Sequence, residues 1–243
     1  MQRKYRTYQR PERRLYREHK YVTSVMNELD NKIAKTDFRD INQIKEIANG
    51  LSNVINLLTF HAKHEDEKIH TLLKKHNSYV VEEIESGHQK HEAIFDHLKE
   101  KLALISKAES EREKVDEGYL FYLSYRRFIA ENLEHIYKEE TLLMPELARL
   151  CTKEELESID YPVYQSMTSE QMVGMLKTLF TVLNFDDKKY FITDLVDAVP
   201  DKVVESWSSI AALLTASEIA DMANRIVLIK QLAEKQLGYC HGS

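Results

Sequence analysis

The sequence predicts an all-α protein, an antiparallel four-helix bundle followed by a C-terminal extension of shorter helices. The 243 residues include only 6 Gly and 4 Pro, so turn-forming residues are scarce and long helices are favoured. Apolar residues recur at helical spacing in four long segments. No segment shows the strict apolar–polar alternation, bounded by turn residues, that is typical of a β-strand.

The first helix is expected from about Pro11 to Lys35, because proline suits a first helical turn. Its apolar residues, at helical spacing, are Leu15, Val22, Met26, Leu29 and Ile33. The second helix is expected from about Ile41 to Lys75. The residues expected on its apolar face are Ile44, Ile47, Leu51, Val54, Leu58, Ile69 and Leu72.

The third helix is expected to begin near Asn77 and Ser78, two residue types that commonly cap helices. Its apolar residues are Ile84, Phe95, Leu98, Leu102 and Ile105. The fourth helix is expected from about Ser110 to Leu150, and its inner face should include Phe121, Phe128 and Leu142.

We therefore assign residues 1–151 to the bundle and residues 152–243 to a helical extension. Three segments of the extension have the pattern of a capping box, which starts a helix, and these are Thr152–Glu155, Thr168–Gln171 and Thr215–Glu218. The extension is expected to pack on the bundle, or to bind a partner protein or a second copy through residues 152–238.

Composition excludes several classes of protein. No run of 18 apolar residues exists, so no membrane span is expected. The N-terminus lacks an apolar signal core, and two cysteines form no disulfide framework, so a reducing cytoplasm is expected. Residues 1–20 contain eight Lys or Arg and two Glu. We interpret them as a solvated arm rather than a phosphate-binding surface, so no nucleic-acid partner is expected.

Each of the four bundle helices has one histidine within its apolar stripe, and the four are His19, His61, His91 and His135. Two helices add a carboxylate one turn later, Glu65 after His61 and Glu139 after His135. A single histidine in such a stripe is usually a hydrogen-bonded core residue. A buried carboxylate is costly unless it is paired or binds a metal.

The histidines are also expected at one level of the bundle. Residues at the same level of an antiparallel pair are equally far from the turn that joins the helices. The midpoints of the successive histidine pairs are about residues 40, 76 and 113, each near a predicted turn. Imidazole and carboxylate ligands suit iron, manganese or zinc. Six such ligands do not fill the coordination positions of two metal ions, so a further small ligand can bind.

The same residues resemble the hemerythrin-like (HHE cation-binding) family over about residues 10–150. The matching motifs are His19, Phe60-His61-x3-Glu65, His91, and His135-Ile-Tyr-Lys-Glu139-Glu140 followed by Leu142-Leu-Met-Pro145. The chain departs from the oxygen-carrying hemerythrins, because Phe95 lies four residues after His91 and Gly87 four before it. It is more similar to the branch with four histidines and two glutamates, which includes iron-centre repair proteins and an iron-sensing ubiquitin-ligase domain.

This resemblance implies two iron ions in an oxo- or hydroxo-bridged centre. It implies that His19 and His61 bind one iron, that His91 and His135 bind the other, and that Glu65 and Glu139 bridge them. The expected function is binding or reduction of dioxygen, nitric oxide or peroxide in redox stress, nitrosative stress or iron homeostasis. Whether the protein is an enzyme stays open.

Three other interpretations remain. The protein could be an iron- or oxygen-responsive regulator or iron handler whose C-terminal helices bind a partner, or an inert helical bundle. A ferritin-like site using Glu67-x-x-His70 and Glu85-x-x-His88 is less favoured, because matching glutamates are absent. His88 could be a fifth ligand or could hydrogen-bond to one. The remaining bundle histidines are interpreted as surface residues, and these are His64, His70, His76 and His97.

Overall fold

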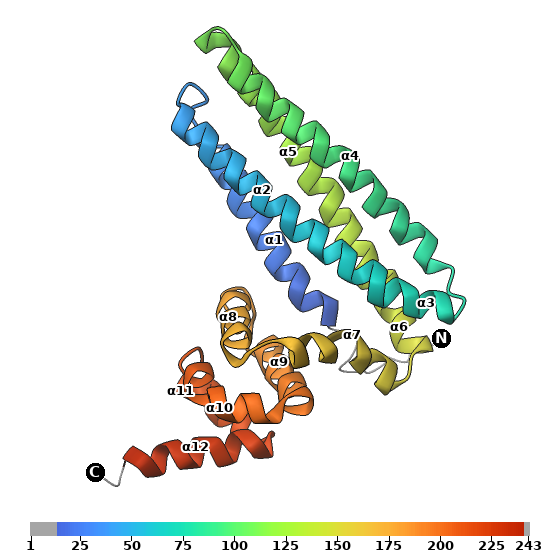
Figure 1. Ribbon diagram of the computed structural model, residues 1–243, viewed down its shortest axis with the longest axis vertical. Helices are drawn as coiled ribbons and strands as arrows, with labels where there is room; N and C mark the ends of the chain where they lie inside the picture. The colour runs from blue at the N-terminus through green and yellow to red at the C-terminus, as the bar shows by residue number, and fades with distance from the viewer. Residues whose placement is uncertain (1–13, 241–243) are drawn as a thin grey trace, which may run out of the picture. The chain divides into compact units, whose positions relative to one another are not determined.

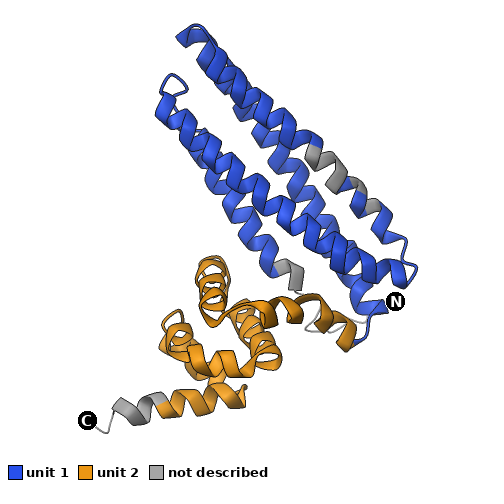
Figure 2. Ribbon diagram, in the orientation of Figure 1, with its two compact units in different colours: residues 1–152 blue, residues 153–243 orange. Residues whose placement is uncertain are grey.

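The computed structural model describes residues 14–240, apart from the side chains at 14–16, 83, 86, 88–92 and 236–240. Contacts divide the chain into two compact units, residues 1–152 and residues 153–243 (Figure 2). Within the described residues both units contain helices and no β-strand, which confirms the predicted all-α class. The predicted helix start at Pro11 and most of the basic arm lie outside the described residues.

Four long helical segments form the first unit (Figure 1). They are α1 (Arg14–Ile33), α2 (Ile41–His64) continued by α3 (Thr71–Lys75), α4 (Val80–Lys107), and α5 (Glu111–Lys138) continued by α6 (Met144–Leu150). Contacts join α1 to α2, α2 to α4, α4 to α5, and α5 back to α1. The segments therefore form an antiparallel bundle around one core, as the sequence predicted.

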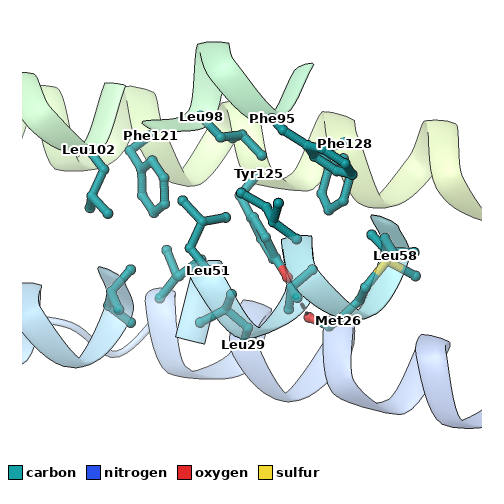
Figure 3. Close-up of a cluster of buried hydrophobic side chains, with 14 of the residues drawn as sticks. Met26, Leu29, Leu51, Leu58, Phe95, Leu98, Leu102, Phe121, Tyr125 and Phe128 are labelled. Carbon is teal, nitrogen blue, oxygen red and sulfur yellow. Dashed lines mark hydrogen bonds between the residues drawn. The ribbon is translucent and has the colours of Figure 1, made fainter. Parts of the chain in front are cut away.

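Most of the predicted apolar stripes are buried in that core, where Phe95, Phe121 and Phe128 pack between the helices (Figure 3). The Tyr125 hydroxyl lies among them and donates a hydrogen bond to the Met26 carbonyl oxygen at 3.1 Å. The buried residues that were predicted are Val22, Met26, Leu29, Ile33, Ile44, Ile47, Leu51, Val54, Leu58, Ile69, Ile84, Phe95, Leu98, Leu102, Ile105, Phe121 and Phe128.

Local interactions set the helix starts. The Asp40 side chain accepts a hydrogen bond from the Asn42 N–H at the start of α2. Ser110 begins α5 with a complete capping box to Glu113. The third segment begins at Val80, two residues after Ser78, where the start was expected near Asn77 and Ser78. Asn77 has a left-handed backbone conformation with φ of 54°, which asparagine tolerates better than most residues.

A π-helical turn interrupts the second and the fourth segments. One turn, Glu65–His70, lies between α2 and α3, and the other, Glu139–Leu143, lies between α5 and α6. A π turn has hydrogen bonds from residue i to residue i+5, so it contains one more residue than an α-helical turn. The residues at the end of each turn and after it can therefore face a different direction from the one that α-helical spacing predicts.

This shift makes two of the predicted core positions wrong. Leu142 is 39 % exposed, and Leu143 is buried instead. In the second segment Leu72 is only half-buried, and Leu73 is buried instead. In both helices the residue that reaches the core lies one position later than predicted, which is the displacement that one extra residue in the turn produces.

The second unit is a series of shorter helices, as predicted: α7 (Lys153–Ser166), α8 (Ser169–Leu179), α9 (Phe185–Ala198), α10 (Pro200–Ala211), α11 (Ala216–Ala223) and α12 (Val227–Cys240). The predicted capping boxes at Thr168 and Thr215 are both present. The Lys202 ammonium donates hydrogen bonds to three carbonyl oxygens at the end of α7 and just beyond it. Across the described chain, none of the helices has the length and apolar character that crossing a bilayer requires.

Candidate metal centre

Four of the six predicted ligands meet inside the bundle. His19 comes from α1 and His61 from α2, while Glu65 and Glu139 are each the first residue of a π turn. One ligand atom from each of these four side chains lies within 4.8 Å of the others. Both carboxylates are deeply buried, with exposed fractions of 0 % for Glu65 and 1 % for Glu139.

The histidine side chains face the carboxylates with their Nε2 atoms. The Nε2 atom of His61 is 3.4 Å from Glu65 Oε1, and that of His19 is 3.8 Å from the same oxygen. His19 Nε2 is also 3.2 Å from Glu139 Oε2. His135 Nε2 is 2.8 Å from the other oxygen of that carboxylate, Glu139 Oε1. Each oxygen of Glu139 therefore faces a histidine from a different helix.

The side chains of His91 and His88 lie outside the described residues, so the structure gives neither of them a place in the site. The backbone of their helix, α4, approaches the centre at Gly87. A Cβ atom added at Gly87 would lie 2.5 Å from His135 Nδ1 and 2.7 Å from its Cε1. Glycine at this position leaves room for the His135 imidazole against the helix.

Two further carboxylates contact the outer nitrogens of the histidines. His19 Nδ1 is 3.1 Å from Glu140 Oε1, and His61 Nδ1 is 3.5 Å from Glu18 Oε2. An outer carboxylate of this kind holds the imidazole orientation and favours the tautomer whose Nε2 is available to a metal. Helical spacing predicted no ligand-orienting role for either residue, although Glu18 directly precedes His19 and Glu140 directly follows Glu139.

These carboxylates raise the pKa values of the two histidines. Burial alone would lower the pKa of His19, but hydrogen bonds to Glu139, Glu140 and Glu65 hold it well above the ordinary value of 6.5. Burial also opposes the charged form of His61, yet its pKa is raised because of the Glu65 charge and the hydrogen bond to Glu18. A proton and a metal ion would compete for the same nitrogens.

The donor set fits a metal ion. Ligand atoms that share one ion at bond lengths of about 2.0–2.2 Å lie roughly 3–4 Å apart, and the nitrogen–oxygen distances in the site are 2.8–3.8 Å. Glu65 and Glu139 are deeply buried, and a metal ion that displaced the histidine protons would supply the positive charge that buried carboxylates need. Both begin a π turn, a feature found frequently at functional sites.

An open pocket with a volume of about 340 Å³ reaches the centre. Its lining includes His61, His135 and Glu139 from the site. The other lining residues are half-buried or exposed ones from α2 and the following π turn, and buried ones from the bundle core, and these are Thr59, Ala62, Lys63, Asp66, Glu67, Val22, Leu58, Phe95, Asn132 and Ile136. A small molecule could therefore reach the ligand atoms from solvent.

One of the histidines interpreted as a surface residue is buried. His70 is fully buried at the end of the first π turn, with its Nδ1 2.8 Å from Asp66 Oδ1 and 3.8 Å from Glu85 Oε1. The prediction was wrong because the π turn rotates His70 inward. The Lys74 ammonium pairs with Glu85, so a positive charge already lies beside the carboxylates near His70. Of the others, His97 is exposed, as predicted, and His64 and His76 are half-buried.

Of the ferritin-like alternative, His70 and Glu85 lie close together, with His70 Nδ1 3.8 Å from Glu85 Oε1, whereas Glu67 is exposed and the side chain of His88 lies outside the described residues. A family model described as the hemerythrin HHE cation binding domain matches residues 10–184 of the chain. No curated protein and no solved structure matches the chain. The family match therefore covers the bundle and continues into the second unit through α8.

Proposed function

The chain belongs to the hemerythrin HHE cation-binding family, and from this we propose that its bundle holds two iron ions that bind a small ligand such as dioxygen, nitric oxide or peroxide. The observation that carries the proposal is the convergence of His19, His61, Glu65 and Glu139, four buried ligands from three helical segments. A reducing cytoplasm is the proposed location, because the chain contains only two cysteines.

We assign His19 and His61 to one iron, His91 and His135 to the other, and the bridging positions to Glu65 and Glu139. The geometry of Glu139 supports a bridge, because its two oxygens face His19 and His135 separately. Glu65 is within 3.8 Å of both histidines of the first pair. The assignment of His91 stands on its place in the family motif.

The side chains around the centre have separate tasks in this proposal. Glu140 and Glu18 orient the imidazoles of His19 and His61 through Nδ1. The pocket admits the small ligand, and Val22, Leu58 and Phe95 form an apolar part of its wall. When bound, an iron pair can exchange electrons with an oxygen- or nitrogen-containing ligand at an open coordination position.

Metal analysis of protein purified from iron-supplemented cells tests the proposal directly. We expect the iron content to approach two ions per chain, with an optical spectrum typical of ferric iron. Zinc or manganese in place of iron would show that the site binds a cation of another kind. A chain that contains no stoichiometric metal would overturn the proposal.

Two matched variants test the ligand assignment. His61→Ala removes a buried ligand and should lower the iron content markedly, since it leaves one iron with a single histidine. His97→Ala removes an exposed histidine from α4 and should leave the iron content unchanged. Equal iron content in both variants would contradict the assignment of His61.

A further inference from the structure

One residue from each helical segment forms the layer of the bundle next to the metal centre. Val22 and Leu58 lie three residues from His19 and His61, Phe95 lies four residues after His91, and Asn132 lies three residues before His135. All four are buried, and all four line the pocket that reaches the centre. Three of them are apolar, so Asn132 is the polar member of this layer.

The Asn132 side chain is almost completely enclosed. Its exposed fraction is 1 %, and within the part of the chain that the structure describes its Nδ2 atom has no hydrogen-bond partner. An amide N–H that is buried without a partner destabilises the folded protein. A leucine would fill the same volume without that cost, so the amide requires an explanation beyond packing.

We propose that Asn132 donates a hydrogen bond from Nδ2 to an anionic, hydrogen-bond-accepting ligand in the pocket. This inference rests on the proposed function and adds a specificity-determining residue to it. The Asn132 amide is 1 % exposed, so little water competes with an acceptor for its Nδ2 donor and the hydrogen bond is strengthened. Asn132 would therefore favour ligands that carry negative charge over apolar molecules of the same size.

Azide is a suitable probe, because it is a small anion that accepts hydrogen bonds. Azide binding to the ferric protein is followed by optical titration, after metal analysis of each variant. Asn132→Leu should keep its iron, bind azide about tenfold more weakly, and raise the melting temperature of the metal-free protein. Asn132→Asp should weaken azide binding further, because it replaces the donor with a negative charge.

Tyr125→Phe is the matched control. It removes another buried polar group from α5, but the Tyr125 hydroxyl has a partner in the Met26 carbonyl and lies outside the pocket lining. This variant should lower the melting temperature and leave the azide affinity unchanged.

Azide affinity of Asn132→Leu equal to that of the wild type would overturn the inference. Loss of iron from that variant would overturn it too, because Asn132 would then support the metal rather than the ligand. Wild-type protein without iron would overturn the proposed function, and the inference with it. That result appears in the metal analysis, before any azide is added.

Discussion

Gly87 places the backbone of α4 against the imidazole of His135, where a side chain of any size would collide with Nδ1. We expect Gly87→Ala to displace His135 from Glu139 and to lower the iron content or weaken iron binding by at least about tenfold, as loss of ligand orientation does. Iron per chain and a competition titration with a chelator measure the effect.

Gly174→Ala is the control for that substitution, because a Cβ atom at Gly174 meets nothing within 4 Å. Alanine favours a helix over glycine by roughly 0.5–1 kcal/mol, so this control should be slightly more stable and bind iron normally. Normal iron binding by Gly87→Ala would show that α4 can move away from His135 without loss.

The raised pKa of His19 predicts how pH and iron together affect stability. A histidine whose pKa is higher in the folded protein than in the unfolded chain stabilises the metal-free protein at pH values below its unfolded-state pKa. That stabilisation is lost as the pH rises through the folded-state pKa. Iron binding displaces the protons, so the stabilisation by iron should increase with pH.

Thermal melting of iron-loaded and metal-free protein measures this. The difference between the two melting temperatures should be larger at about pH 8 than at about pH 6. A difference that is the same at both pH values would show that His19 does not carry a proton in the metal-free protein.

At the scale of the helical element, the π turn after Glu139 decides which leucine reaches the core. Leu143→Ala should cost about 2–5 kcal/mol of the free energy of unfolding, because Leu143 is fully buried. Leu142→Ala should cost less than about 1 kcal/mol, because Leu142 is 39 % exposed. Chemical denaturation of the two variants gives both values, and the reverse order would mean that the helix continues without a wide turn.

The same turns mark the limit of what the sequence could predict. Helical spacing was sufficient to place His19, His61, Glu65 and Glu139 on inner faces, because each lies before or at the start of a π turn. It failed for His70, Leu72 and Leu142, which lie within or after the turns. A single sequence carries no periodic signal for one wide turn, since apolar residues at i+3 and i+4 fit either neighbouring register.

Residues that surround the candidate ligands were missed for a different reason. Glu18 and Glu140 contact histidines of other helices, and the sequence alone does not reveal such contacts. Asn132 is at core spacing, three residues before His135. A polar residue at a core position beside a candidate ligand was the available signal.

At the scale of the whole molecule, the bundle core and the described site residues all lie within residues 1–152. We therefore propose that the chain divides near residue 151, and we expect a fragment of residues 1–152 to fold cooperatively and to bind iron as the full chain does. Calorimetry and metal analysis of the fragment test this. An unfolded fragment would place the boundary later, toward residue 184, where the family match ends.

The two π turns also affect how this chain must be aligned with its relatives. A relative whose second and fourth helices are continuous α-helices would be one residue shorter after the positions of Glu65 and Glu139. An alignment that omits these two single-residue gaps would pair Leu142 and Leu72 with inward-facing positions of the relative, although neither is fully buried in this chain. A gap after Glu65 and another after Glu139 would restore the match with Leu73 and Leu143.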